Sequence, residues 1–400
     1  MFYFLYHVLP KIASVIIGLY LWLHFVKLPF IHVIGRKWKT VPWFLAVLLV
    51  ELCVLTGTDI WNIGAVGILF LCYAFLITDV INFILKKLKQ IEQRRGIQLL
   101  RWKFQERIPE GVTRGKKFTR IYHIWRKIYF DGVFSLLLTV VFLLYGFWNM
   151  RNVCYQDYHI STEKEGMEEG LFLAAISDVH LGTTMTVEEF EEYCHEIEQQ
   201  KPELLVVAGD LVDENTPEGA MERACQILGN LQLKYGVYYI YGNHDMGTHG
   251  GNPYFDRKDI KREMLANQVH FLYDEAELVD NRFYVIGRKD AGTVKKKKRK
   301  STQELLEGLD KKKFLLMLDH QPYQLAEEAA QGVDFQISGH THGGQIWPVG
   351  ILTTMFRLNE MNYGYQQDGN YQIVVSSGMG GFSYPIRTGS QSEILRIWIN

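Results

Sequence analysis

The sequence predicts an α-helical membrane domain over residues 1–150 and an α/β domain over residues 171–400. Three observations predict this division. Long apolar stretches are confined to residues 1–150, whereas short apolar runs alternate with amphipathic helical patterns after residue 170. The charge divides at the same place. Residues 1–150 hold 19 Lys and Arg against 7 Asp and Glu, and residues 151–400 hold 24 against 37.

Four apolar stretches are the candidate transmembrane helices, at residues 9–26, 42–58, 63–85 and 132–150. A helix needs about 20 apolar residues to cross the hydrocarbon core, with about 17 as the lower limit. The stretch 42–58 is the weakest candidate because it is short and contains Glu51. A cleaved signal peptide is the alternative for 9–26, but no basic segment precedes it and no small-residue cleavage site follows it.

Basic loops predict the orientation of these spans. The connection 27–41 has four Lys and Arg and no acid, and the connection 86–131 has 14 Lys and Arg against 4 acids. Lys and Arg stay on the cytoplasmic side. Residues 97–108 and 118–130 mix aromatic and basic side chains at helical spacing, so we expect amphipathic helices on membrane lipids there. A polar linker, 151–170, and the α/β domain are then expected on the extracytoplasmic side of the cell membrane.

Glu51 and Asp79 lie inside predicted spans, where an acidic side chain is costly. Such acids raise the hypothesis of a channel or transporter. Neighbouring helices that satisfy the two carboxyl groups are the alternative.

The α/β domain is predicted from nine short apolar strands separated by turns and helices. The strands are expected at 171–177, 203–210, 237–245, 270–276, 282–290, 313–321, 334–342, 371–379 and 393–399. Three helix starts carry capping signals. These are Thr186 with Glu189, Thr216 with Pro217, and Ser301 with Glu304.

Metal-binding residue types follow five of these strands, where the loops of an α/β sheet converge on one rim. They are Asp178, His180, Asp210, Asn243, His244, His320, His340 and His342. Carboxylate, amide and imidazole groups without a thiolate suit Mn²⁺, Fe or Zn²⁺. So many ligands exceed the needs of one tetrahedral ion and suit two divalent ions that clamp a phosphoryl group.

The order Asp-x-His, Gly-Asp, Gly-Asn-His-Asp, His, Gly-His-Thr-His resembles the calcineurin-like metallophosphoesterase superfamily over residues 171–400. The segments GHTHGGQ (339–345) and GMGGFSYPIR (378–387) resemble its membrane-associated bacterial branch. That branch includes enzymes similar to UDP-diacylglucosamine hydrolases and other exported phosphoesterases. The resemblance implies two mixed β-sheets sandwiched between helices.

The resemblance also implies roles for individual residues. One metal would be bound by Asp178, His180, Asp210 and His342, and the second by Asn243, His320, His340 and the bridging Asp210. His244 would face the scissile phosphate and protonate the leaving group. Arg387 is a candidate for gripping a second phosphate by a bidentate contact, with a surface arginine in a turn as the alternative.

The expected function is a membrane-anchored dinuclear-metal phosphoesterase that uses metal-activated hydroxide. It would cleave a phosphomonoester, phosphodiester or pyrophosphate bond, and a lipid-linked substrate fits the membrane location. The alternative from another class is a membrane sensor or scaffold with an inactive metal-binding domain.

The basic run 295–300 has no aromatic platform nearby, so no nucleic acid is expected as a partner. That run is therefore interpreted either as a solvated loop or as a contact with anionic lipid headgroups. The sequence indicates no oligomeric state.

Overall fold

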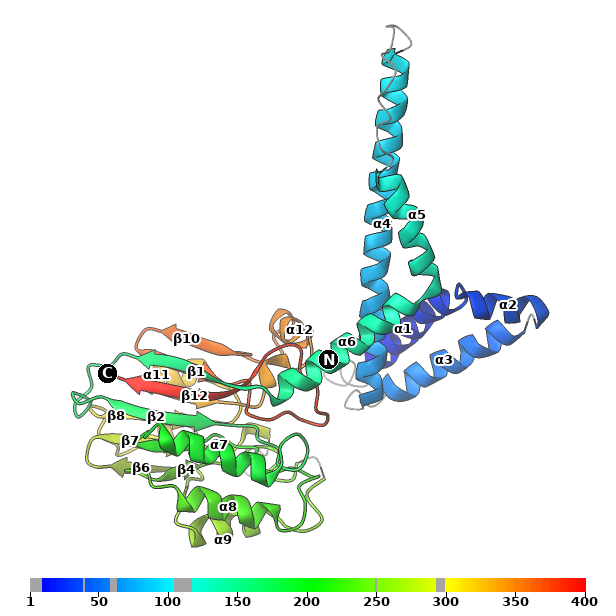
Figure 1. The fold of residues 1–400 in the computed structure, drawn as a ribbon. Coiled ribbons are helices and arrows are strands. Elements are labelled where there is room, and N and C mark those ends of the chain that lie inside the picture. Colours follow the sequence, from blue (N-terminus) through cyan, green and yellow to red (C-terminus); the bar gives the residue numbers. More distant parts are fainter. Residues whose placement is uncertain (1–8, 39, 58–62, 104–116, 249, 293–298) are drawn as a thin grey trace. The chain divides into compact units, whose positions relative to one another are not determined.

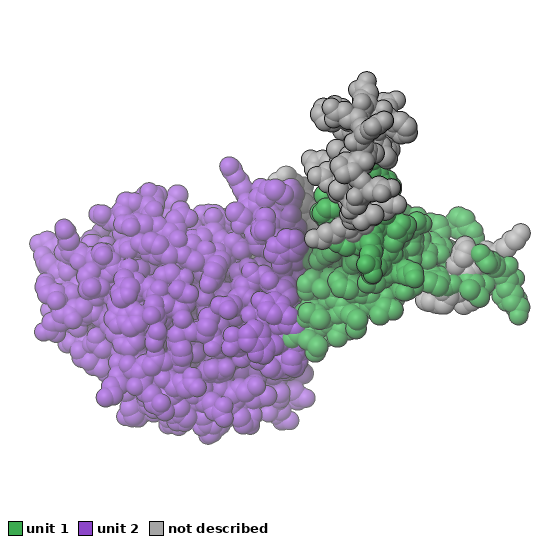
Figure 2. Space-filling model, turned by 45° about the horizontal axis from the view of Figure 1, so that its top comes forward, with its two compact units in different colours: residues 1–144 green, residues 145–400 purple. Residues whose placement is uncertain are grey.

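The computed structural model divides into two compact units, residues 1–144 and 145–400 (Figure 2). It describes residues 9–38, 40–57, 63–103, 117–248, 250–292 and 299–400. Most of the predicted basic run, residues 295–298, lies outside the described residues.

The first unit is helical. Its elements are α1 (Leu9–Phe25), α2 (Pro29–Lys37), α3 (Val41–Gly57), α4 (Ile63–Lys103), α5 (Lys117–Asp131) and most of α6 (Val133–Arg151). Of these, α1, α3, α4 and α6 each begin within one residue of a predicted apolar stretch. Two segments of the described chain are long and apolar enough to cross a membrane, 63–94 and 133–151. The apolar helical segments 11–25 and 41–53 are shorter, so four crossings stay a prediction.

Helix α4 continues 18 residues past the predicted end of its span at residue 85, to Lys103. Its extension is rich in Lys, Leu, Gln, Ile and Arg, which favour continued helix. The amphipathic helix expected at 97–108 is therefore the last part of α4 as far as residue 103, and its remainder lies outside the described residues. Helix α5 agrees with the second predicted amphipathic helix.

Asp79 on α4 is satisfied by neighbouring helices. Its carboxylate accepts hydrogen bonds from Tyr20 Oη at 2.8 Å and from Tyr129 Oη at 2.5 Å, and it lies 3.1 Å from His24 Nε2. These side chains come from α1 and α5, so Asp79 joins three helices of the unit. The contacts favour a structural role for this acid and weaken the transporter hypothesis.

The expected linker 151–170 is not a linker throughout, because it contains strand β1 (Val153–Ile160). This strand pairs in parallel with β12 (Ser392–Ile399) along its whole length. It lies at the edge of its sheet, and most of its residues are partly exposed. An edge strand needs few buried apolar residues, which explains why its sequence resembles a polar connection.

The second unit contains two mixed six-stranded sheets (Figure 1). The first has the order β1-β12-β2-β3-β4-β5, with β2 (Leu171–Ile176), β3 (Leu204–Val207), β4 (Val237–Tyr239) and β5 (His270–Phe271). The second has the order β10-β11-β9-β8-β7-β6. Its strands are β6 (Glu275–Val279), β7 (Phe283–Gly287), β8 (Phe314–Leu318), β9 (Phe335–Ser338), β10 (Gly364–Asp368) and β11 (Tyr371–Val375). Both sheets contain parallel and antiparallel pairs, which confirms the predicted α/β class with two mixed sheets.

Alternation along the strands builds three apolar layers. On β3, Leu204 and Val206 face the second sheet, whereas Leu205 and Val207 face the helices α7 (Val187–Gln199), α8 (Ala220–Asn230) and α9 (Arg257–Ala266). The outer face of the second sheet packs on α10 (Thr302–Leu305) and α11 (Leu325–Gln331). Strands buried on both faces have nearly continuous apolar sequences, as the sequence of this domain does.

Two of the three predicted helix caps are present. Thr186 and Ser301 each cap a helix and form a capping box with Glu189 and Glu304. Thr216 does not cap α8, which begins at Ala220 after Gly219. Its hydroxyl instead donates to Leu181 O at 2.7 Å and ties two loops of the site rim together.

Candidate metal centre

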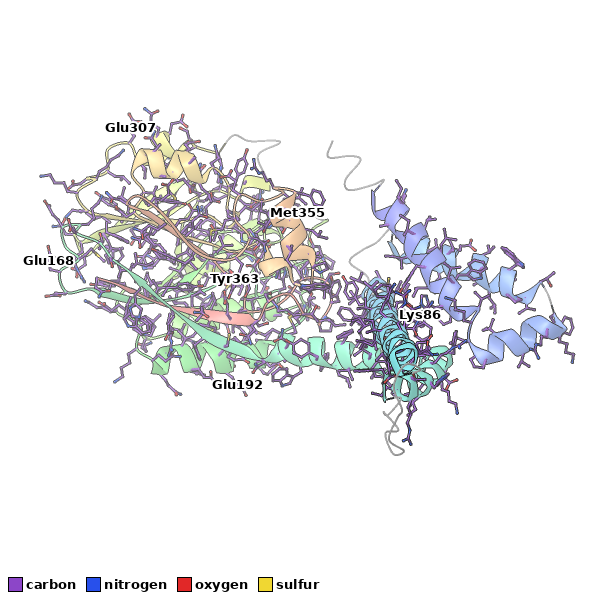
Figure 3. All side chains as sticks on the ribbon, turned by 90° about the horizontal axis from the view of Figure 1, so that it is seen from above. Lys86, Glu168, Glu192, Glu307, Met355 and Tyr363 are labelled. Carbon is purple, nitrogen blue, oxygen red and sulfur yellow. The ribbon has the colours of Figure 1, made fainter. Side chains whose placement is uncertain are left out.

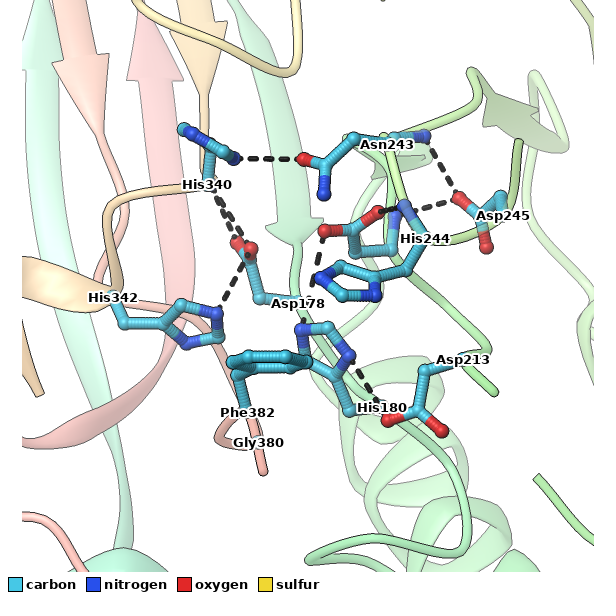
Figure 4. A network of polar contacts seen from close by, with 12 residues as sticks. Asp178, His180, Asp213, Asn243, His244, Asp245, His340, His342, Gly380 and Phe382 are labelled. Carbon is cyan, nitrogen blue, oxygen red and sulfur yellow. Dashed lines mark hydrogen bonds and ion pairs between the residues drawn. The ribbon is translucent and has the colours of Figure 1, made fainter. Parts of the chain in front are cut away.

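The loops after β2, β3, β4, β8 and β9 converge on one rim of the second unit (Figure 4). The structure brings together there all seven residues proposed as metal ligands, together with His244. Because the strands that lead into these loops run parallel in each sheet, their carboxyl ends meet at the same edge.

The first group of ligand atoms comes from Asp178, His180 and His342, all of them buried. These atoms lie within 4.8 Å of one another. His342 Nε2 is 3.6 Å from Asp178 Oδ1. One carboxylate and two imidazoles at this spacing could hold one divalent ion.

The second group comes from Asp210, His320 and His340, again with ligand atoms within 4.8 Å of one another. The side-chain oxygen of Asn243 completes it, at 3.2 Å from His320 Nε2 and 2.8 Å from His340 Nδ1. Such a set of oxygen and imidazole donors suits a second ion of the same kind.

Asp210 lies between the two groups. Its Oδ2 atom is 3.0 Å from His320 Nε2 in the second group and 4.0 Å from His180 Nε2 in the first. Its Oδ1 atom accepts a hydrogen bond from the His244 backbone N–H at 2.8 Å. This position fits the bridging carboxylate that the family resemblance implies for Asp210.

Unpaired imidazole nitrogens show that the first group fits a cation. Nε2 of His180 and Nδ1 of His342 are buried, with no hydrogen-bond partner among the described residues. A buried polar atom without a partner costs about 1–3 kcal/mol. A bound cation would give such nitrogens a ligand bond.

The backbone at the ligands is also unusual. Five of the seven have a positive φ, between 47° and 70°: Asp178, His180, Asp210, His340 and His342. A non-glycine residue held in a sparsely populated backbone region costs about 1–3 kcal/mol. Such strain is retained where the surrounding structure needs one side-chain direction, as at a metal site.

Two close approaches require glycine at this rim. A Cβ atom on Gly339 would lie 2.2 Å from Asp178 Oδ2, and one on Gly242 would lie 2.1 Å from Asp210 Oδ1. Any larger residue at either position would displace a proposed ligand. The close approach of Asp210 to Gly242 and of Asp178 to Gly339 thus explains why the Gly-Asn-His-Asp and Gly-His-Thr-His motifs begin with glycine.

The protonation states depend on burial and on neighbouring charges. Burial lowers the pKa of His342 well below its usual value, so this imidazole is neutral and can donate a lone pair. Burial alone would raise the pKa of Asp210, but the adjacent His320 holds it well below its usual range. Asp210 is therefore ionised, as a bridging ligand must be.

His244 lies beside the two groups rather than within them. Its Nδ1 atom is 3.0 Å from Glu214 Oε2, and its ring centroid is 4.5 Å from that of Phe382. Burial lowers the pKa of His244, but the hydrogen bond with Glu214 and the charge of Asp210 outweigh it and raise the pKa to about 9. The imidazole is thus held in its protonated form, as a general acid requires.

Sequence reasoning missed Glu214. The residue follows the Gly-Asp motif by four positions, and only its place in that loop could have drawn attention to it. Asp213, one position earlier, serves the other histidine: its Oδ2 is 3.3 Å from His180 Nδ1. Two consecutive acids therefore orient two different imidazoles.

Asp245 and Asp319 follow ligand-bearing strands, but only Asp245 supports a proposed ligand. Asp245 accepts backbone N–H bonds from Asp210, Val212 and Gly242, so it fixes the loop that carries Asp210. Asp319 does not orient His320. Its carboxylate pairs with Arg299 at 2.8 Å, whereas His320 Nδ1 contacts Ala208 O at 2.8 Å.

The expectation that Arg387 grips a substrate phosphate is wrong. The side chain is fully buried, and its terminal nitrogens donate to the carbonyl oxygens of Ser377, Gly380 and Gln391 and to Ser390 Oγ at 2.9 Å. Arg387 therefore organises the loop 377–391. That loop carries Phe382 to the site, and its Gly380 N–H bonds to Asp178 O at 2.9 Å.

Comparison with known proteins shows which family the second unit is similar to. The model of the calcineurin-like phosphoesterase family matches residues 173–344. The chain is 30% identical over 249 residues to an uncharacterized metallophosphoesterase of Aquifex aeolicus, covering 61% of the chain and 90% of the relative. It is 27% identical over 284 residues to a metallophosphoesterase of Campylobacter jejuni, covering 70% of the chain and 72% of the relative.

A vertebrate relative has a name that mentions a membrane. The chain is 27% identical over 274 residues to the zebrafish (Danio rerio) transmembrane protein with metallophosphoesterase domain. The match covers 66% of the chain and 62% of that relative, so the chain spans less than two thirds of its length. Together with two apolar helices of spanning length, this similarity supports membrane association.

Proposed function

The chain belongs to the calcineurin-like metallophosphoesterase family, and from that premise we propose a membrane-anchored enzyme that hydrolyses a phosphate ester at the extracytoplasmic surface. The chain is a metal-dependent phosphoesterase by its family. The single observation that carries the proposal is the pair of ligand groups on either side of Asp210, with the His244 imidazole beside them, 3.0 Å from Glu214.

Asp178, His180, Asp210 and His342 would hold one ion, and Asp210, Asn243, His320 and His340 would hold the other. When bound, two such ions, which we propose to be Mn, Fe or Zn, would supply an activated water and would neutralise charge on the phosphoryl oxygens. The residues themselves fix the spacing of the two positions through the shared carboxylate of Asp210.

His244 has the position and protonation state of the group that protonates the leaving oxygen. Its Nδ1 faces Glu214, and we assign the proton transfer to its Nε2. The Phe382 ring packs against the imidazole and shields it from water on that side. A positioned acid of this kind contributes roughly 10²–10⁴-fold to the rate.

The location outside the cytoplasm is supported by the charge of the chain. The basic segment 86–131 begins in the last part of the first helical segment of spanning length, 63–94, and ends before the second, 133–151. If that segment is cytoplasmic, α6 leads outwards and the second unit follows it. This conclusion does not depend on whether α1 and α3 cross the membrane.

The direct connection of the second unit to the helix α6 indicates the class of substrate that we propose. A site joined to a membrane helix with no intervening linker remains near the bilayer, where lipid-linked phosphomonoesters, phosphodiesters and pyrophosphates are concentrated. A lipid-linked phosphate is therefore the substrate that we propose first.

The test uses the full chain in nanodiscs with Mn²⁺. Hydrolysis of a small phosphomonoester, a small phosphodiester and a lipid-linked phosphate would be compared between the wild type, His244→Ala and His195→Ala. His195 is an exposed residue of α7 and serves as the matched control. We expect His244→Ala alone to lose hydrolysis while bound metal, measured by elemental analysis, is retained.

Two outcomes would contradict the proposal. Equal hydrolysis by wild type and His244→Ala would exclude the assigned acid. Bound metal without hydrolysis of any of the three substrates would favour the sensor or scaffold function.

A further inference from the structure

An exposed apolar surface directly follows the metal-binding loop of His340 and His342. It consists of α12 (Val349–Met355) and its flanking residues, and every residue of α12 is at least partly exposed. The apolar side chains on it include Trp347 (52% exposed), Ile351 (59%) and Met355 (63%); of these, Figure 3 labels Met355. Soluble domains rarely leave so many large apolar side chains uncovered in one short segment.

The composition of this α12 surface fits a lipid bilayer. Residues 347–359 contain no acid, and their one charged side chain is Arg357. Met355 and Phe356 follow Ile351 and Leu352 by four positions, so they extend one apolar strip along the helix. Tryptophan and long apolar side chains with a basic residue are typical of segments that lie at the membrane interface.

The α12 surface also lies close to the end of α6, the helix that is expected to leave the membrane. Within the second unit, the Arg387 N–H donates to Gly146 O at 2.9 Å, and Asn149 Nδ2 donates to Ser390 O at 2.7 Å. The Trp347 N–H donates to Thr388 Oγ1 at 3.2 Å. One short segment, 387–390, therefore contacts both the end of α6 and the start of the α12 surface.

Exposed aromatic residues mark the α6 side of the same contact. Tyr145 and Trp148 are both exposed, and their rings pack at 6.2 Å between centroids. Arg151 lies over the Phe147 ring at 3.7 Å. Aromatic and basic residues of this kind are enriched where a helix leaves the bilayer.

The α12 surface is joined to the proposed metal ligands. Thr341 lies between His340 and His342, and its hydroxyl donates to Asn362 O at 2.6 Å. Thr353 of α12 donates to Asn362 Oδ1 at 3.1 Å. Asn362 thus connects α12 to the loop that carries His340 and His342.

We propose that the α12 surface inserts its apolar side chains into the outer leaflet and holds the metal centre at the level of the lipid headgroups. The inference rests on the proposed function in one respect, which is that α6 crosses the membrane. It goes beyond the proposed function because it assigns a second contact with lipid, made by α12, in addition to the crossing of α6. It also implies that a phosphate in the headgroup layer reaches the site without leaving the bilayer.

The experiment measures lipid contact independently of catalysis. A bimane fluorophore is attached to a cysteine at Met355 in the full chain, with the native cysteines replaced, in nanodiscs with or without brominated acyl chains. Leu265 on α9, 54% exposed, is the matched control position. We expect several-fold stronger quenching by brominated lipid at position 355 than at 265, with metal content unchanged.

Equal quenching at the two positions would overturn the α12 proposal. Excimer fluorescence from pyrene at position 355 would show that a second copy of the chain covers α12, and it would overturn the proposal too. Failure of the proposed function looks different: the wild type would hydrolyse no ester, while quenching at position 355 would persist.

A second variant tests the consequence for turnover. Ile351→Ser combined with Met355→Ser keeps the ligands and removes two exposed apolar side chains. We expect several-fold slower hydrolysis of a phosphate ester presented in lipid vesicles, and unchanged hydrolysis of a soluble ester. Equal loss on both substrates would indicate damage to the site and would count against lipid docking.

Discussion

The proposed role of Glu214 depends on one contact, in which its Oε2 atom lies 3.0 Å from His244 Nδ1. In Glu214→Gln the imidazole keeps a neighbour of the same size but loses the negative charge. We expect kcat to fall at least about 10-fold, part of the roughly 10²–10⁴-fold that a positioned general acid contributes. Steady-state kinetics with metal content as a second readout would check this, with the exposed Glu218→Gln as control.

The same variant has a predicted pH signature. Glu214 raises the pKa of His244, and the acid acts only while protonated, so activity falls as the pH rises through that pKa. Glu214→Gln removes the charge that favours the imidazolium, and the alkaline limb of the pH–rate profile should move to lower pH. A limb that stays in place while kcat falls would indicate that Glu214 does not act through His244.

Asp210 should control both metals because it lies between the two ligand groups. We expect Asp210→Asn to lose most of both ions, whereas His342→Ala should lose mainly the one in its own group. Elemental analysis of the purified full chain would measure the stoichiometry, and Asp157→Asn, an exposed carboxylate on β1, is the control. Retention of two ions in Asp210→Asn would contradict the bridging assignment.

The clustering of the candidate ligands at one rim was predictable from motifs that follow strands, as with Asp178, Asp210 and His340. Contacts that depend on side-chain direction were not predictable. Arg387 sits in a motif segment near the ligands, yet it is buried among backbone carbonyls and does not face the substrate. No spacing rule shows that Glu214 and Asp213 serve different histidines.

At the scale of elements, a buried ion pair joins α11 to the second sheet. Arg288 follows β7, and its side chain forms a close ion pair with Glu328 on α11, with both side chains fully buried. Removing one partner of a buried pair costs about 3–5 kcal/mol because the other charge stays buried. Asp319, 3.8 Å from Arg288, remains as a partner and offsets part of this cost, so we expect Glu328→Ala to lower the free energy of unfolding of the second unit by up to that amount.

The control is an exposed pair on the other side of the domain. Arg223 and Glu191 approach to 2.6 Å at the surface, and such a pair contributes about 0–1 kcal/mol. Urea unfolding of the full chain, followed by tryptophan fluorescence, should show a large loss for Glu328→Ala and a small one for Glu191→Ala. Equal losses would mean that burial does not set the strength of these pairs.

Elements with strong periodicity were predictable, and those fixed by tertiary pairing were not. Helix α7 agrees with the capping box at Thr186 and with the buried side chains of Phe190, Cys194 and Ile197. Strand β1 escaped prediction because its stability comes from pairing with β12, at the opposite end of the domain sequence. Thr216 has the pattern of a helix cap, but its hydroxyl bonds to a neighbouring loop instead.

At the scale of the whole molecule, the division of charge between residues 1–150 and 151–400 has a testable consequence for topology. A basic segment resists transfer across the membrane, whereas an acidic domain does not. The segment 86–131 and the second unit are separated by α6, which is long and apolar enough to cross. They should therefore lie on opposite sides of the membrane.

Single cysteines test this in a chain whose native cysteines are replaced. Glu168→Cys marks the second unit and Lys127→Cys marks α5; both positions are exposed to solvent. A membrane-impermeant maleimide applied to intact cells should label position 168 and spare position 127 until the membrane is permeabilised. The opposite pattern would place the site in the cytoplasm and direct the substrate search to soluble phosphate esters. The α12 surface would then be expected to dock on the inner leaflet, because its proximity to α6 does not depend on the side.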